Sequence, residues 1–533
     1  MKMKKIIYKI FFISLLMAMS SCIGDLDTEP LNERITTSTD VFKDPASYRE
    51  FLAKLYGAMT LTGQRGEYGQ PEISAPDEGT TSFLRTYWSA QEITTDECIS
   101  AWGDPGLVEF HGHNWSEQNA YVQLLYQRIF INIAYCNEFI REVSPRVEGL
   151  PAPLREDVKQ YLAEARFLRA LYYYFALDLW GNVPFVTEAD APGAFLPRQI
   201  SRTDLFLYVE SELKEILPAL ALPRSNEYAR ADQAAAWTLL AKLYLNAAVY
   251  LGDGNNHYTD CVTYCKLIMN SGGYSLQNSY SHLFLADNDQ WGNEIIFAVA
   301  EDGDNGRNYG GVTFIIHAAV GGSEDADNDF GIGSGGWWGN RLTNSFVEKF
   351  PDPSGDTDAR AMFYTDGQTL EINNPTVFTE GYLSTKFRNI TSGGLKGKNP
   401  TFVDTDFPMF RLADVYLMYA EAVLRGGTGG DAATALNVVN LIRQRAYGDT
   451  SGNITPADLT LDFILDERAR ELYWEAHRRT DLIRYGLFTG EQYLWDWKGN
   501  VKQGSSTQSH VVLFPLPASD RAVNTNLKQN PGY

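Results

Sequence analysis

Apolar residues recur at intervals of three and four along most of this 533-residue chain, a spacing that predicts amphipathic helices. The first predicted helix follows Asp44 and Pro45, whose residue types favour a helix start. The helices predicted ahead of the C-terminal region span 47–60, 115–142, 154–180, 204–217, 230–251 and 258–270. Consecutive antiparallel pairs of such helices are typical of a tetratricopeptide-like solenoid. We therefore predict a mainly α fold on a helical repeat scaffold.

The stretch from Phe407 to Gly486 has the most regular pattern, and we interpret it as three helices. The first two are the apolar stripes over 412–423 and 435–446, and a glycine pair after the first stripe is typical of a helix end. The third begins near Thr460 and carries a high density of charge. Opposite charges one turn apart in it predict ion pairs: Glu467 with Arg470, Glu475 with Arg478 and Arg479, and Asp481 with Arg484.

Exposed ion pairs of this kind contribute only about 0.3–0.5 kcal/mol each. Bidentate arginine contacts to neighbouring helices would contribute more. No His, Ser or Cys nucleophile accompanies the charges at a catalytic spacing. We therefore interpret the charge cluster as structural rather than catalytic.

Two long regions, around 64–112 and 302–410, have weak helical periodicity and are rich in Gly, Asn, Asp, Thr and aromatic residues. Short apolar runs at 294–300 and 312–318 are consistent with a few short strands. Long irregular segments inside a compact chain are more often functional than accidental. We predict that these loops carry the binding function and that the helices provide a rigid scaffold.

The N-terminus has the features of a secretory signal over residues 1–21. Four lysines precede and enter the apolar run 6–19, which is short for a membrane span and ends at Ser20, Ser21 and Cys22. A cysteine at this point predicts a bacterial lipoprotein in which Cys22 is acylated; an ordinary signal with an incidental cysteine is the alternative. The polar residues 22–40 are predicted to be a tether, followed by a single domain over 41–533.

The chain has 45 basic and 67 acidic residues and a net charge of −22, which becomes −26 once the signal with its four lysines is removed. Such a charge excludes nucleic acid and anionic lipid surfaces as partners, because both require a basic surface. The cysteines at 98, 136, 261 and 265 have no partners that suggest a zinc or redox site. We predict that they are small core residues and form no disulfide framework.

Three segments carry a family resemblance: RFLRALYYYFALDLWGNVPFVTE from Arg166, the stretch 407–486, and LFPLPASDRAVNTNLKQNPGY from Leu513. Together they resemble the SusD/RagB family of outer-membrane glycan-binding lipoproteins. The resemblance implies a non-catalytic cell-surface protein that passes oligosaccharides to a SusC-like TonB-dependent transporter. It also implies tetratricopeptide-like repeats, and Asp25 and Asp27 after the lipid anchor resemble Bacteroidetes surface-export signals, which places the body on the outer face of the outer membrane.

Glycan sites combine flat aromatic side chains with a few polar ones, because sugar rings have apolar faces and equatorial hydroxyls. Both irregular regions contain such residues. Several of their motifs resemble the starch-binding member of the family, including PEISAPDEGTTSFLRT, EITTDECISAW, RNYGG and GSGGWW. The resemblance implies a starch or α-glucan site made of Asp77, Arg85, Trp102, Tyr309 and Trp337. The sequence departs from the family pattern at two places. Gly103, Asp104 and Pro105 follow Trp102 where the family member has a polar amide. Trp338 is adjacent to Trp337, which leaves the match at Trp337 uncertain by one position.

Oxygen-rich segments suggest a structural calcium ion and no organic cofactor. The resemblance makes Asp289, Asp404 and Asp406 the candidate ligands, with solvated acidic loops as the alternative. Two other functions stay open. One is binding of a different polysaccharide, such as dextran. The other is a secreted glycoside hydrolase, which needs two carboxylates flanking the scissile bond, for which the candidates are Asp77, Glu78, Asp96 and Glu97.

Overall fold

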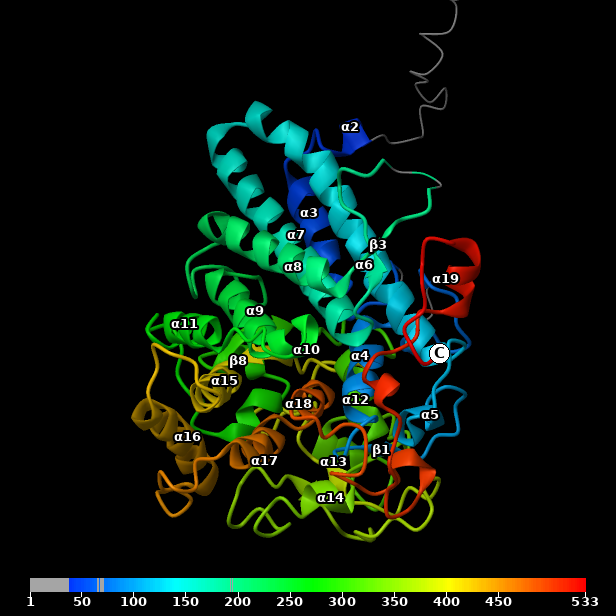
Figure 1. The fold of residues 1–533 in the computed structure, drawn as a ribbon, viewed down its shortest axis with the longest axis vertical. Coiled ribbons are helices and arrows are strands. Elements are labelled where there is room, and N and C mark those ends of the chain that lie inside the picture. The colour runs from blue at the N-terminus through cyan, green and yellow to red at the C-terminus, as the bar shows by residue number, and fades with distance from the viewer. Residues whose placement is uncertain (1–37, 65–66, 68–70, 192, 194) are drawn as a thin grey trace, which may run out of the picture. The chain divides into compact units, whose positions relative to one another are not determined.

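The computed structural model describes residues 38–64, 67, 71–191, 193 and 195–533 (Figure 1). By its internal contacts the chain divides into two units, Met1–Arg49 and Glu50–Tyr533. The predicted signal, the acylated Cys22 and residues 22–37 of the tether lie outside the described residues. No helix among the described residues is both long enough and apolar enough to cross a membrane. The second unit contains the scaffold and both of the predicted binding loops.

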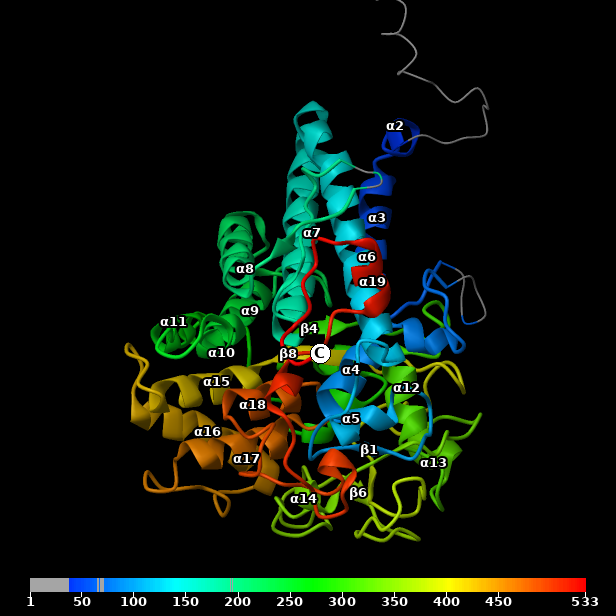
Figure 2. The same ribbon diagram turned by 45° about the vertical axis from the view of Figure 1, so that its right-hand side comes forward.

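The second unit is built mainly from helices that pack in antiparallel pairs, as predicted (Figures 1 and 2). Helix α6 packs along α7 and α7 against α8, while α11 packs between α9 and α15. Helix α15 also packs against α16 and α17. The bounds are α3 Ala46–Gly57, α6 Ala120–Val143, α7 Ala152–Leu179, α8 Arg202–Ile216, α9 Gln233–Leu245, α10 Ala247–Leu251, α11 Tyr258–Met269, α15 Leu412–Leu424, α16 Ala432–Tyr447, α17 Leu461–Leu472 and α18 Arg478–Arg484.

Side-chain caps fix the starts of several of these helices. The side chains of Asn119, Asp232 and Thr460 accept hydrogen bonds from the first-turn amides of α6, α9 and α17. The core between the helices is rich in fully buried aromatic residues, and Trp88, Trp180, Trp474 and Trp495 are the largest of them. The four described cysteines are buried and unpaired, which confirms the prediction that they are small core residues.

The strands among the described residues form four antiparallel pairs. The longest joins β4 (Ile295–Val299) to β8 (Phe407–Arg411), which confirms the strand predicted at 294–300. The other pairs are β1 (Ile99–Ser100) with β5 (Asn340–Arg341), β2 (Val183–Pro184) with β3 (Gln199–Ile200), and β6 (Phe363–Tyr364) with β7 (Leu383–Ser384).

Two segments predicted as strand or irregular chain are helices. The run 312–318 belongs to α12 (Gly311–Ala318), and α4 (Phe83–Glu92) lies within the first irregular region. All residues of both helices are buried. The run 312–318 is short and mostly apolar, so periodicity alone cannot distinguish a buried helix from a strand there, and α4 is only ten residues long. The two helices pack against each other (Figures 1 and 2).

The third helix predicted near the C-terminus is instead two helices, α17 and α18, separated at residues 473–477. Trp474 and Ala476 adopt left-handed backbone angles, with φ of 61° and 62°. The break leaves the amides of these two residues without helical partners, and carboxylates from a distant segment accept hydrogen bonds from them. Glu97 Oε2 lies 3.2 Å from Trp474 N, and Glu92 Oε1 lies 2.6 Å from Ala476 N. These acceptors offset the cost of interrupting the helix.

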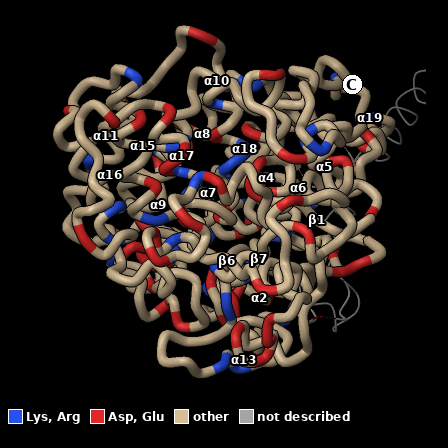
Figure 3. Tube along the Cα trace, turned by 90° about the horizontal axis from the view of Figure 1, so that it is seen from below, with Lys and Arg blue, Asp and Glu red and all other residues tan. Residues whose placement is uncertain are grey.

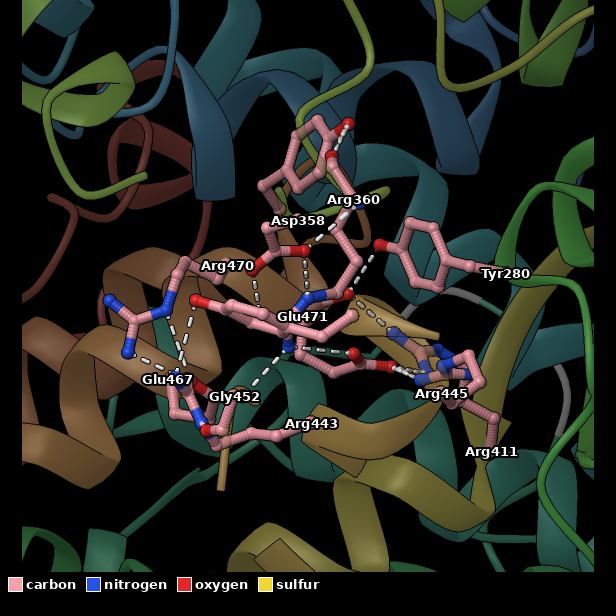
Figure 4. A network of polar contacts seen from close by, with 12 residues as sticks. Tyr280, Asp358, Arg360, Arg411, Arg443, Arg445, Gly452, Glu467, Arg470 and Glu471 are labelled. Atoms are coloured by element: carbon pink, nitrogen blue, oxygen red, sulfur yellow. Dashed lines mark hydrogen bonds and ion pairs between the residues drawn. The ribbon is translucent and has the colours of Figure 1, made fainter. Parts of the chain in front are cut away.

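The charge cluster is buried rather than exposed (Figure 4). Arg411 contacts Glu294, Glu471 and Glu475 at 2.5–2.8 Å, and these carboxylates are fully buried. Two predicted pairs are present: Glu467 with Arg470 and Asp481 with Arg484, both at 2.8 Å or less. The ion pairs that the structure gives Glu475 are instead with Lys386 and Arg411. The cluster joins α17 to β8, α16 and the loop that holds Arg360, which is a structural role.

Acidic and basic positions are interspersed along the backbone trace of the second unit in Figure 3. Many of its arginines are buried in ion pairs and do not reach the surface. The charge distribution therefore agrees with the exclusion of nucleic acid drawn from the net charge of −22.

Candidate functional site

A cavity of about 420 Å³ lies where the two irregular regions meet. It is lined by all five of the residues predicted as sugar contacts and by one further residue: Asp77, Arg85, Trp102, Asp104, Tyr309 and Trp337. The five residues come from four separate segments of the chain. Their grouping depends on tertiary contacts, which are described below.

The pairing of β1 with β5 brings Trp102 to Trp337 across 235 positions of sequence. Beyond the paired residues, Ala101 N donates to Gly339 O at 2.7 Å. Trp102 then donates from Nε1 to the carbonyl oxygen of Trp337 at 2.9 Å. A Cβ on Gly339 would lie 2.6 Å from the Trp102 ring, so only glycine allows this close approach.

The three aromatic rings form a continuous wall of the cavity. The centroid of the Trp337 ring lies 6.5 Å from that of Trp102 and 6.1 Å from that of Tyr309. On its other side Trp337 stacks on His317 of α12, at 4.6 Å and 18°. Both ring nitrogens of His317 lie 2.7 Å from carbonyl oxygens, those of Gly335 and Thr401, so the imidazole is a fixed support.

The structure places Trp337 and Trp338 differently with respect to the cavity. Trp337 is half-buried and lines the cavity. Trp338 has a left-handed φ of 52° and is 57% exposed, and its ring packs against Gly321 instead. Trp337 is therefore the ring that the structure offers to a ligand in this cavity.

The polar side of the cavity is an ion pair. Asp77 caps the short 3-10 helix Glu78–Thr81 through Gly79 N, and its Oδ2 lies 2.9 Å from Arg85 Nη1. Arg85 is nearly buried in α4, lies over the Phe314 ring of α12 and donates to Tyr309 O at 3.2 Å. A Cβ on Gly79 would lie 2.4 Å from Tyr309 O and 2.7 Å from Arg85 Nη1, so this glycine is required by the packing. Asp77 is 51% exposed and lines the cavity.

Glu78 lies beside this pair and is partly buried. Burial, together with the nearby carboxylate of Asp77, raises its pKa to about 7 and outweighs the lowering effects of the Tyr309 backbone, Arg85 and Arg128. The carboxyl of Glu78 is therefore part protonated near neutral pH. It adds a pH-dependent charge close to the Asp77 and Arg85 pair.

The carboxylates proposed for a hydrolase are not arranged as a catalytic pair. Asp96 is fully buried and holds Arg478 at 2.7 Å, and Glu97 is buried and accepts the Trp474 amide. Neither lines the cavity, and Asp77 is paired with Arg85. Glycoside hydrolysis needs two accessible carboxyl groups on either side of one bond. The geometry gives this alternative no support.

Two of the three candidate calcium ligands accept hydrogen bonds from the protein itself. Asp404 accepts the amides of Gly303 and Lys398 and pairs with the Lys398 ammonium at 3.1 Å. Asp406 is buried and accepts from Glu301 N, whereas Asp289 is exposed. No three His, Cys, Asp or Glu side chains among the described residues converge as metal ligands. Calcium binding stays a prediction without support from this geometry.

Sequence reasoning missed Asp104 as a lining residue and the supports behind the aromatic wall, Phe314 and His317. The supports lie in the run that was predicted as a strand, so their side-chain directions could not be derived. The sequence signal that could have identified Asp104 was the departure from the family pattern directly after Trp102.

Comparison with known proteins gives matches over nearly the whole chain. The model described as "SusD family" matches residues 340–533, and one described as "Starch-binding associating with outer membrane" matches residues 45–245. The starch-binding protein SusD of Bacteroides thetaiotaomicron is 34% identical, covering 99% of both chains. A SusD-like protein of Formosa agariphila is 26% identical over 73% of this chain and 76% of its own.

Solved structures support the same assignment at the level of the fold. A SusD superfamily protein of Parabacteroides distasonis is 23% identical with a TM-score of 0.70, covering 94% of this chain and 100% of its own. A surface glycan-binding protein A of Bacteroides thetaiotaomicron, solved in complex with laminarihexaose, is 18% identical with a TM-score of 0.67, covering 91% and 99%. Two of these relatives, SusD and the surface glycan-binding protein A, are named as binding proteins. The identity with SusD over nearly the full length, together with the shared fold, shows that the chain belongs to the SusD family.

Proposed function

We propose that this protein is a non-catalytic, cell-surface glycan-binding protein whose ligand is starch or a related α-glucan. The observation that carries the proposal is the cavity in which three aromatic rings form one wall and the Asp77 and Arg85 pair forms a polar edge. Rings can stack on the apolar faces of successive sugars, while the ion pair bonds to hydroxyls. The name of the SusD relative, a starch-binding protein, supports the ligand class. The laminarihexaose complex of a structural neighbour supports an oligosaccharide as the type of ligand.

The affinity for one short oligosaccharide should be weak. Each ring contributes about 0.5–1.5 kcal/mol beyond the burial of area, if ring pairing is a fair analogue for stacking on sugar. Three rings and a few exposed hydrogen bonds then correspond to dissociation constants of about tens of micromolar to millimolar. Many surface copies acting on one long polymer would hold it much more tightly.

The test is a panel of polysaccharides immobilised in affinity gels, with amylopectin, dextran, laminarin and a soluble cellulose derivative run against the purified protein. We expect the strongest retention by amylopectin, because an arc of rings suits a curved α-1,4-linked chain. Preferred retention by dextran would assign the alternative ligand. Preference for the flat β-1,4-linked chain would contradict the α-glucan proposal, and no retention by any member would contradict glycan binding.

The proposed location and partner extend this function. Cys22 would carry the lipid anchor on the outer face of the outer membrane, and the tether over 22–40 would let the body move above a SusC-like TonB-dependent transporter that receives the oligosaccharides. The family model described as associating with the outer membrane supports the location.

A Cys22→Ala variant tests the anchor. Without an acylated cysteine, the protein should move from the membrane fraction to the soluble fraction, and the wild-type chain processed in parallel is the control. Affinity purification after detergent extraction should recover a large β-barrel partner with the wild type. Membrane retention of the variant would contradict the anchor, and repeated recovery of the wild type alone would contradict a stable complex.

A further inference from the structure

Asp104 is the lining residue that no prediction assigned. It lies on the loop between Trp102 and the helix α5 (Val108–Gly112), where its carbonyl oxygen accepts from Leu107 N at 3.0 Å. Its side chain is exposed and faces the cavity. Within the part of the chain that the structure describes, the carboxylate takes part in no hydrogen bond or ion pair.

The other charges around the cavity do not compensate this carboxylate. Asp77 and Arg85 neutralise each other at 2.9 Å, so Asp104 leaves the cavity with a net negative charge. Two arginines that do not line the cavity are also engaged in ion pairs. Arg128 pairs with Glu72 at 2.6 Å, and Arg307 lies 3.7 Å from the carboxylate of Asp304.

A second carboxyl beside the cavity acts in the same direction. Glu78, with a pKa of about 7, adds part of a negative charge at neutral pH and more above it. The whole chain is acidic, with a net charge of −22. An anionic ligand that enters the cavity is therefore repelled by the nearby carboxylates and by the net negative charge of the protein. Among the described lining residues it finds no unpaired cation.

We infer that Asp104 is a specificity-determining residue that restricts the cavity to uncharged glycans and rejects chains carrying uronic acid or sulfate groups. The inference rests on the proposed glycan-binding function and names the substrate class. A free carboxylate accepts hydrogen bonds from sugar hydroxyls, so neutral chains gain contacts. An anionic group of a ligand near Asp104 is repelled, and an unpaired charge is an effective device against the wrong ligand.

The experiment measures binding of two matched probes by isothermal titration or affinity electrophoresis. The probes are maltoheptaose and the same oligosaccharide with primary hydroxyls oxidised to carboxylates. Wild-type protein should bind the neutral probe at least tenfold more tightly. In Asp104→Asn, which keeps the size of the side chain, the ratio of the two dissociation constants should fall about five- to tenfold, since the repulsion of one close charge pair is removed.

A structural role for Asp104 would not produce the salt dependence that we expect. Raising the ionic strength from about 0.02 to about 0.5 M should lower the ratio of the two dissociation constants in wild type, because salt screens the repulsion. The same change should lower this ratio much less in Asp104→Asn. Asp356→Asn is the matched control. This residue is exposed and lies outside the cavity, so the same loss of charge should leave the ratio unchanged.

The outcomes separate the inference from the function on which it rests. If wild type binds the neutral probe and the ratio is the same in Asp104→Asn, the inference is overturned and the proposed function stands. Equal binding of both probes by wild type would also overturn the inference and leave the proposed function standing. If wild type binds neither probe nor any polysaccharide of the panel, the proposed function falls and the inference falls with it.

Discussion

Replacing both Trp102 and Trp337 by alanine is expected to abolish retention of the protein in an amylopectin affinity gel. The two rings lie 6.5 Å apart on one wall, and their removal leaves Tyr309 as the remaining aromatic lining residue. Each single substitution should weaken binding about 2- to 12-fold, which corresponds to the 0.5–1.5 kcal/mol of one stacking contact. Gel mobility with and without polysaccharide measures the effect.

The double substitution also affects stability, because the structure shows both rings half-buried rather than exposed. Trp102 donates to the Trp337 backbone, and Trp337 stacks on His317. A fully buried tryptophan replaced by alanine costs about 3–5 kcal/mol, so we expect a loss of about half of that at each of these half-buried sites. Thermal unfolding of each variant must therefore accompany the binding measurement.

Trp338→Ala provides the matched control. The residue is adjacent in sequence, 57% exposed and outside the cavity, so its removal should leave retention unchanged. Loss of binding in this variant with intact binding in Trp337→Ala would assign the platform to the other tryptophan. A folded double variant that is still retained as strongly as wild type would contradict the proposed site.

Arg411→Met is expected to lower the free energy of unfolding by about 3–5 kcal/mol or to prevent folding. The guanidinium is buried and pairs with three carboxylates, those of Glu294, Glu471 and Glu475. Figure 4 shows Arg411 beside Glu471. Removing one partner of a buried ion pair leaves uncompensated charge in a medium that solvates it poorly. The measurement is urea denaturation followed by circular dichroism.

An exposed ion pair supplies the comparison. Lys159 pairs with Glu156 at 3.0 Å, with 44% and 70% of the side chains exposed. Lys159→Met should therefore change the free energy of unfolding by less than about 1 kcal/mol. An Arg411 variant that folds and loses no more stability than this control would show that the buried network is not needed for stability.

The same network implies a pH dependence of stability. Burial opposes ionisation of Glu471, but the guanidinium groups of Arg445, Arg411 and Arg360 outweigh it and lower its pKa below the usual value. A carboxyl with a lowered pKa in the folded state contributes stability above its unfolded pKa of about 4.3, and this contribution is lost as the pH falls below that value. The free energy of unfolding should therefore decrease below about pH 4. Such a decrease would be further evidence for the network that Arg411→Met disrupts.

Local sequence signals determined the scaffold, the family and the candidate residues. Apolar spacing and capping residues such as Asn119, Asp232 and Thr460 act over one or two turns, so the main helices and strand β4 could be predicted from the chain alone. Short motifs were enough to identify the family, which the comparisons confirm. They also named five residues that lie around one cavity, although their role in binding stays a prediction.

Only the tertiary structure decided the features that depend on distant partners. Helices α4 and α12 are short and buried on every side, and the break between α17 and α18 depends on Glu92 and Glu97, more than 370 positions away. The choice of Trp337 over Trp338 and the place of Asp104 follow from the pairing of β1 with β5. Periodicity and caps report neighbours along the chain, whereas strand pairing, complete burial and remote hydrogen-bond acceptors arise only when separate segments meet.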